Sequence, residues 1–160
     1  MATSAVLLVV AMLTPVWVYW IDWSGWQQSL GLMWYCFAWN QMFQAGCVYN
    51  WMNATTIQKF TVAFLIIAVL LCITGFIMAI IGCFKRGRPL AAPALPLFAA
   101  LACAAVLTAL IVWGVNMERN QFVGYSLLCA IAADIILLLA VFVALMAITC
   151  TKYEARSFLP

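Results

Sequence analysis

Four long apolar stretches account for most of the chain, and they constrain its fold more than any other feature. They run over about 3–21, 60–84, 90–114 and 124–150. A helix needs about 20 mostly apolar residues to cross about 30 Å of hydrocarbon. Only 7% of the residues are charged, whereas about a quarter of an average soluble chain is charged. The sequence therefore predicts an all-α membrane protein, a single domain over 1–160 built on a four-helix transmembrane bundle.

The basic residues indicate how the bundle is oriented. They gather in the link 85–88 and in the tail, at Lys152 and Arg156. Because basic residues favour the cytoplasmic side of a membrane, we expect that link and both termini to be cytoplasmic. The segments 22–59 and 115–123 then form outer loops of a multi-pass plasma membrane protein. The second of these is short and polar, and we expect it only to turn the chain.

The first apolar stretch also has the position of a signal peptide. However, it lacks a basic start and a small-residue cleavage site, and it continues into the aromatic segment 15–20. We therefore expect a retained helix.

Seven cysteines divide by their predicted depth. Cys36 and Cys47 both lie in the outer loop, where the compartment is oxidising and disulfides persist. We predict a disulfide between them. Cys83 and Cys150 lie at the cytoplasmic ends of their spans and are candidates for palmitoylation. The remaining three lie within the spans, where we expect them to act as small packing residues: Cys72, Cys103 and Cys129.

The first outer loop is rich in aromatic residues and carries charges only at its edges. A disordered loop has the opposite composition, so we expect this loop to fold. Aromatic content predicts strands over 32–39 and 47–52, with turn residues between them. The alternative is an aromatic belt at headgroup depth. We predict that the folded loop presents an interaction surface made of Trp34, Tyr35, Phe37, Trp39, Phe43, Tyr49 and Trp51.

Two further positions carry specific expectations. Asn53-Ala54-Thr55 matches a glycosylation acceptor, although its closeness to the membrane is expected to hinder the transferase. Asp134 lies in the middle of the fourth stretch, where a carboxyl group is costly and indicates function. One interpretation is an acid that faces the bundle and is hydrogen-bonded to Thr74 or Thr108. The other is a contact with a partner subunit.

The spacing of several residues resembles the first outer loop of the claudin and peripheral myelin protein superfamily. The matching residues are Trp17, Gly31, Leu32, Trp34, Cys36 and Cys47, with Trp34 shifted by one position. Trp20 and Trp23 are alternatives to Trp17. The resemblance implies a left-handed four-helix bundle topped by a small extracellular β-sheet from the first outer loop. Members of the superfamily use this sheet to meet neighbouring proteins.

The resemblance implies two functions. The first is adhesion at cell–cell junctions through self-association of the outer loop. Because the loop is poor in charge, a barrier is favoured over an ion-selective pore. The alternative is an auxiliary subunit of a membrane channel or receptor complex. The expected partners are therefore the lipid bilayer and either further copies of the chain or other four-span or channel proteins.

Enzymatic activity is not expected. The chain has no histidine, the commonest general base, and its four acids lie at different depths. We expect no catalytic residues, no cofactor, no metal site and no small-molecule substrate. The short basic link does not indicate nucleic-acid binding.

Overall fold

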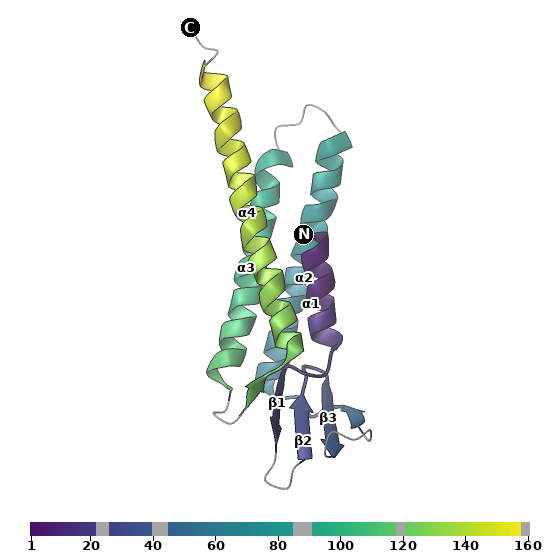
Figure 1. Cartoon of the computed structure of the whole chain (residues 1–160). Helices are drawn as coiled ribbons and strands as arrows, with labels where there is room; N and C mark the ends of the chain where they lie inside the picture. The colour runs from purple at the N-terminus through teal and green to yellow at the C-terminus, as the bar shows by residue number, and fades with distance from the viewer. Residues whose placement is uncertain (22–25, 40–44, 85–90, 118–120, 158–160) are drawn as a thin grey trace.

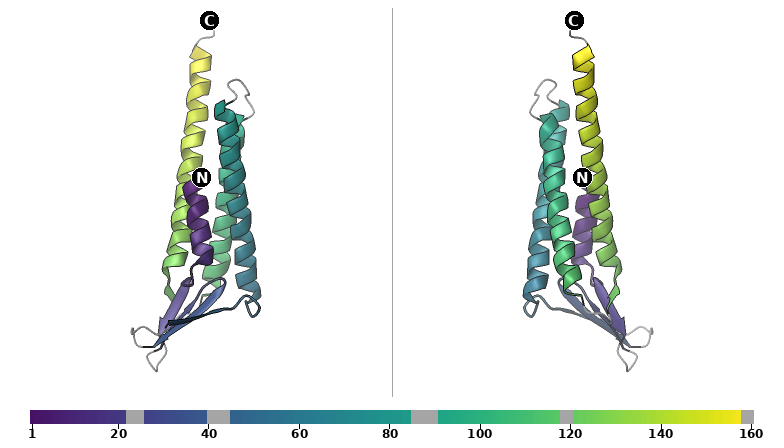
Figure 2. Two further views of the ribbon diagram at one scale, coloured as in Figure 1. Left: turned by 90° about the vertical axis from the view of Figure 1, so that its right-hand side faces the viewer. Right: turned by 90° about the vertical axis from the view of Figure 1, so that its left-hand side faces the viewer.

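The computed structural model describes residues 1–21, 26–39, 45–84, 91–117 and 121–157. Its helices form an elongated bundle, and its strands form a sheet across one end of that bundle (Figure 1, Figure 2). The helices are α1 (Ala2–Leu13), α2 (Thr56–Phe84), α3 (Ala91–Val115) and α4 (Tyr125–Ser157). The strands are β1 (Val18–Ile21), β2 (Trp26–Leu30), β3 (Trp34–Trp39), β4 (Ala45–Tyr49) and β5 (Phe122–Val123). The described chain is thus helical with one small antiparallel sheet.

Three helices are long and apolar enough to cross a bilayer. The spanning segments are Thr56–Ile81, Leu95–Val115 and Tyr125–Thr149. They correspond to the predicted stretches 60–84, 90–114 and 124–150, and they indicate a multi-pass membrane protein. Helices α2 and α4 begin beside the sheet, and α3 ends there (Figure 1). The end of α2, the start of α3 and the end of α4 therefore lie at the opposite end of the bundle.

The first predicted span, 3–21, is wrong in its second half. Helix α1 ends at Leu13, and its 12 residues cover only about 18 Å, less than a bilayer core. Pro15 explains the early end, because proline lacks an N–H and biases the preceding residue away from helical geometry. Thr14 is accordingly extended, with φ −81° and ψ 144°. The chain continues into β1, so residues 18–21 belong to the sheet and not to a helix.

The sheet has five antiparallel strands in the order β4-β3-β2-β1-β5. The prediction of two strands from the first outer loop is incomplete, because this loop contributes three, β2, β3 and β4, and β1 comes from the end of the predicted first span. The fifth strand, β5, comes from the second outer loop and pairs with β1 through Val18↔Val123 and Tyr19↔Phe122. The expectation that this loop only turns the chain is therefore wrong, since it completes one edge of the sheet.

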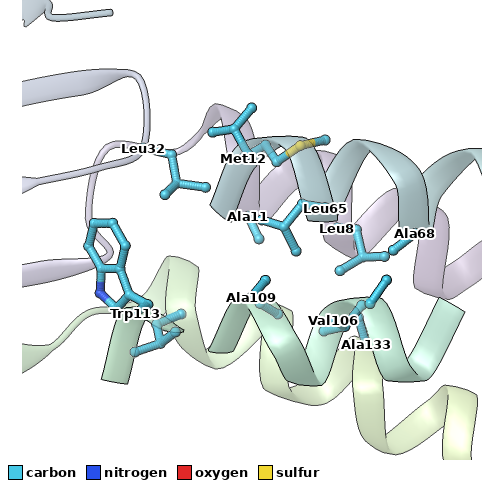
Figure 3. Packing of buried hydrophobic residues seen from close by; sticks show 14 of the residues in the cluster. Leu8, Ala11, Met12, Leu32, Leu65, Ala68, Val106, Ala109, Trp113 and Ala133 are labelled. Carbon is cyan, nitrogen blue, oxygen red and sulfur yellow. The ribbon is translucent and has the colours of Figure 1, made fainter. Parts of the chain in front are cut away.

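Small side chains fill much of the bundle core. Ala68, Ala102, Ala109 and Ala133 have no exposed surface, and they allow the helix backbones to approach closely. Larger residues such as Leu8 complete the cluster between the helices (Figure 3). The cluster is continuous with the base of the sheet.

Candidate interaction surface

The β3–β4 hairpin is cross-linked as predicted. Cys36 and Cys47 are directly opposite each other in the register of the two strands, and they form a disulfide. Cys36 is buried and Cys47 is exposed. The cross-link ties the edge strand β4 to the interior of the sheet.

The predicted aromatic residues contact one another along the sheet. The rings of Trp34 and Tyr49 meet edge to face, with 5.5 Å between their centroids. Phe37 lies against Trp26, with 6.3 Å between centroids, and the Tyr35 hydroxyl donates a hydrogen bond to the Gln28 side chain. These contacts use part of each ring for packing within the sheet. Only the remainder is available to a partner.

The predicted surface residues do not all share one role. Trp51 packs against the bundle core, so it belongs to the join between sheet and bundle rather than to an open surface. Trp39 is the last residue of β3, and its side chain lies outside the described part. Phe43 lies outside the described residues altogether.

Several exposed apolar residues of the sheet were not predicted. Ile21, Val48, Phe122 and Val123 all have large exposed fractions, from 47% to 63%. Val48 lies on the edge strand beside Cys47. The sequence feature that could have predicted its exposure is the short apolar run after that cysteine. The sequence around Phe122 and Val123 does not predict a strand, because a strand of two residues is defined only by its pairing with β1. Together with Phe37 and Tyr49 we call these the exposed sheet residues: Ile21, Phe37, Val48, Tyr49, Phe122 and Val123.

Three residues of the claudin-like motif lie where the sheet meets the bundle: Trp17, Gly31 and Leu32. Trp17 is fully buried, its Nε1 donates to the Ala11 carbonyl oxygen at 2.6 Å, and its ring is 5.2 Å from that of Trp113. Leu32 is 1% exposed and joins the bundle core. These residues therefore orient the sheet on the bundle and are not part of its open surface.

Gly31 occupies a place where a side chain does not fit. A Cβ atom on this residue would lie 2.8 Å from the Cα atom of Pro15. Its carbonyl oxygen accepts a hydrogen bond of 3.2 Å from Nε2 of Gln58, near the start of α2. The turn between β2 and β3 is thus held between the end of α1 and the beginning of α2.

The start of α2 is closed by a reciprocal cap. The Gln58 Oε1 accepts from the backbone N–H of Thr55 at 2.7 Å, and the Gln58 N–H donates to Thr55 Oγ1 at 3.3 Å. This is the capping-box pattern, which satisfies two free donors at a helix start. Gln58 is 4% exposed, so its polar atoms need these partners. The signal in the sequence is the spacing of Thr55 and Gln58, which the overlapping glycosylation acceptor concealed.

Asp134 faces the interior of the bundle. It is 4% exposed, and the Cys103 thiol on α3 lies beside its carboxyl group. The prediction of a hydrogen bond from Asp134 to Thr74 or Thr108 is wrong. Thr74 Oγ1 donates to the carbonyl oxygens of Leu70 and Leu71, and Thr108 Oγ1 donates to the carbonyl oxygen of Ala104. This burial leaves little of Asp134 available to a partner subunit.

The two modification hypotheses remain predictions. Cys83 belongs to α2 and Cys150 to α4, both near the helix ends that point away from the sheet, and their side chains lie outside the described part. Asn53 is exposed three residues before α2 begins, and its N–H donates to the Asn50 carbonyl. Among the described residues, no group of three His, Cys, Asp or Glu side chains gathers in a metal-binding arrangement.

No protein-family model matches the chain, and no curated protein matches it in sequence.

Proposed function

We propose that the chain is a claudin-like adhesion protein of the plasma membrane, which associates with further copies of itself through its extracellular sheet. In this proposal the sheet faces the cell exterior, the link 85–88 and the C-terminus are cytoplasmic, and the protein concentrates at cell–cell contacts. The residues that resemble the claudin superfamily support it, and so does the disulfide, which suits an oxidising compartment.

The observation that carries the proposal is the apolar character of the sheet outside the bundle. Val48 and Tyr49 on the edge strand are 57% and 54% exposed, and Phe122 on the opposite edge is 55% exposed. Exposed apolar patches on a folded domain generally mark interaction sites, and Val48 and Tyr49 are adjacent residues of the edge strand β4. Strand β4 is also an open edge of the sheet without the charges or prolines that usually protect such edges.

A barrier fits this surface better than an ion-selective pore. The five strands contain no Asp, Glu, Lys or Arg among their described residues. Selection of cations usually requires rings of acidic side chains, and selection of anions requires basic ones. A contact made by such neutral strands would exclude water and ions alike.

The alternative, an auxiliary subunit of a channel or receptor complex, has less support. It drew on Asp134 as a contact to a partner within the membrane, and this side chain is buried in the bundle. The exposed sheet residues are compatible with either function. Self-association is therefore the proposal we put first.

The proposal can be tested in cells that lack other junction proteins. Tagged wild-type chain is expected to concentrate at contacts between two expressing cells, and not where an expressing cell meets a non-expressing one. Val48→Glu places a charge on the exposed edge and should abolish this enrichment. Met52→Glu is the matched control, because it adds the same charge at an exposed apolar position outside the sheet.

Surface biotinylation establishes that both variants reach the plasma membrane in equal amounts. Enrichment that survives Val48→Glu, or diffuse wild-type protein that co-purifies stoichiometrically with a large membrane complex, would contradict self-association. The second result would establish the auxiliary-subunit alternative instead.

A further inference from the structure

A cavity of about 200 Å³ lies between the sheet and the ends of two spanning helices. Its walls come from β2, the start of α2, the end of α3 and the segment just before β5. The lining residues are Leu30, Thr55, Ile57, Gln58, Trp113, Asn116, Met117 and Gln121. None of the motif residues or exposed sheet residues is among them, so the cavity is separate from the surface proposed for adhesion.

One of the lining residues, Trp113, carries a buried hydrogen-bond donor without a partner. The side chain is 6% exposed, and its Nε1 has no hydrogen-bond partner, the only such buried polar atom among the described side chains of the lining. A buried N–H without a partner is unfavourable, because it has given up its hydrogen bonds to water and gained none in return. The neighbouring Trp17 shows the contrast, since its own Nε1 is satisfied by a carbonyl oxygen. Figure 3 shows Trp113 at the sheet-side end of the core, near Leu32.

The lining determines the chemistry of a ligand. It contains apolar side chains and neutral amides and hydroxyls, but no Asp, Glu, Lys or Arg among the described residues. Thr55 and Gln58 already use their polar atoms in the helix cap. The described lining therefore suits a part of a ligand that is uncharged, that offers an acceptor to the Trp113 N–H and that tolerates contact with Ile57 and Leu30.

The position of the cavity indicates where such a ligand comes from. The spanning segment of α2 begins at Thr56 and that of α3 ends at Val115, so the cavity lies at the sheet-side boundary of the hydrocarbon. Hydroxyl and ester groups of membrane lipids are found at this depth, and tryptophan is enriched there. Binding does not require that the sheet mediate adhesion.

We propose that this cavity binds the neutral polar end of a membrane lipid, with Trp113 Nε1 donating to its hydroxyl or ester carbonyl oxygen. A sterol hydroxyl and a glycerolipid ester share this chemistry. The apolar remainder of either molecule would extend into the bilayer beside the bundle. The bound oxygen satisfies the one buried donor of the described lining that the fold leaves without a partner.

The proposal can be tested with full-length protein in phosphatidylcholine nanodiscs. One sample contains a photoreactive cholesterol analogue, and another contains a phosphatidylcholine with a photoreactive group near its ester. After illumination, mass spectrometry should locate the label on peptides that contain 55–58 or 113–117. Label from the first probe identifies a sterol, and label from the second identifies a glycerolipid.

Three variants separate binding from general contact with lipid. Trp113→Phe keeps an aromatic ring but removes the N–H, and should reduce saturable labelling about fivefold, the worth of one neutral hydrogen bond. Ile57→Trp fills the cavity and should remove labelling at this site. Trp34→Phe is the matched control, because Trp34 lies on β3 and is not among the lining residues, and it should label like the wild type.

The intact Cys36–Cys47 disulfide and an unchanged elution volume in detergent verify that each variant is folded. Labelling spread evenly along the spans, or unchanged by both cavity variants while they remain folded, would overturn the proposal. Absence of label from both probes would overturn the proposal as well, and would indicate that water fills the cavity.

Discussion

The sheet end and the bundle are held together by different interactions. At the sheet end, directed contacts dominate: a disulfide, a buried tryptophan that donates to a carbonyl, and a glutamine that joins a helix cap to a turn. In the bundle, alanines without exposed surface dominate. Helices in lipid gain no hydrophobic free energy by associating and depend on close packing, whereas a domain in water must satisfy its polar groups. Small changes at the sheet end should therefore be the more damaging.

Loss of the disulfide should have the largest effect. Cys36→Ser removes a cross-link that closes a separation of 11 residues, which is worth about 2–3 kcal/mol on the chain-entropy estimate. We expect a lower thermal unfolding midpoint in detergent and poor delivery to the cell surface. Cys129→Ala is the control, because Cys129 is a free cysteine that is partly exposed. Normal delivery of both Cys36→Ser and Cys47→Ser would show that the sheet folds without its cross-link.

Two glycines compare the same change in a turn of the sheet and in a spanning helix. Gly31→Ala places a Cβ atom 2.8 Å from the backbone of Pro15, which must move, and it should cost about 2 kcal/mol. Gly114→Ala meets no atom within 4 Å and lies in α3, where alanine is favoured over glycine by about 0.5–1 kcal/mol. The thermal unfolding midpoint should therefore fall in Gly31→Ala and rise in Gly114→Ala. Equal midpoints would show that the contact between Gly31 and Pro15 is not tight.

The same contrast separates what the sequence predicts from what it does not. The three spanning helices follow from apolar length alone, and the pairing of Cys36 with Cys47 follows from depth and compartment. The end of α1 had a local signal in Pro15, but the apolar run around it concealed that signal. Strand β5 had none, because Phe122–Val123 is a strand only by virtue of its pairing with the distant β1. The bond from Gln58 to Gly31 is equally non-local, so only the cap within 55–58 was accessible to prediction.

Removing Gln58 should have an intermediate effect. Gln58→Ala opens the capping box and leaves the Gly31 carbonyl without its side-chain donor. Loss of a cap and of one buried hydrogen bond should together cost between about 1 and 2 kcal/mol. Gln27→Ala, on a partly exposed position of β2, is the control and should change the unfolding midpoint little. If both variants unfold at the same temperature, the link between sheet and α2 contributes nothing measurable.

The smallest effect is expected inside the bundle, at its one buried carboxyl group among the described residues. Asp134→Asn keeps the shape of the side chain beside Cys103 and removes the cost of burying a charge, so its effect should stay below about 1 kcal/mol. The adjacent Ala133 has no exposed surface, and Ala133→Leu adds a bulky branched side chain where helices pack, which should cost about 1–3 kcal/mol. Thermal unfolding in detergent should therefore rank the apolar change as the more harmful. The reverse order would mean that a polar contact, and not packing, holds α3 and α4 together.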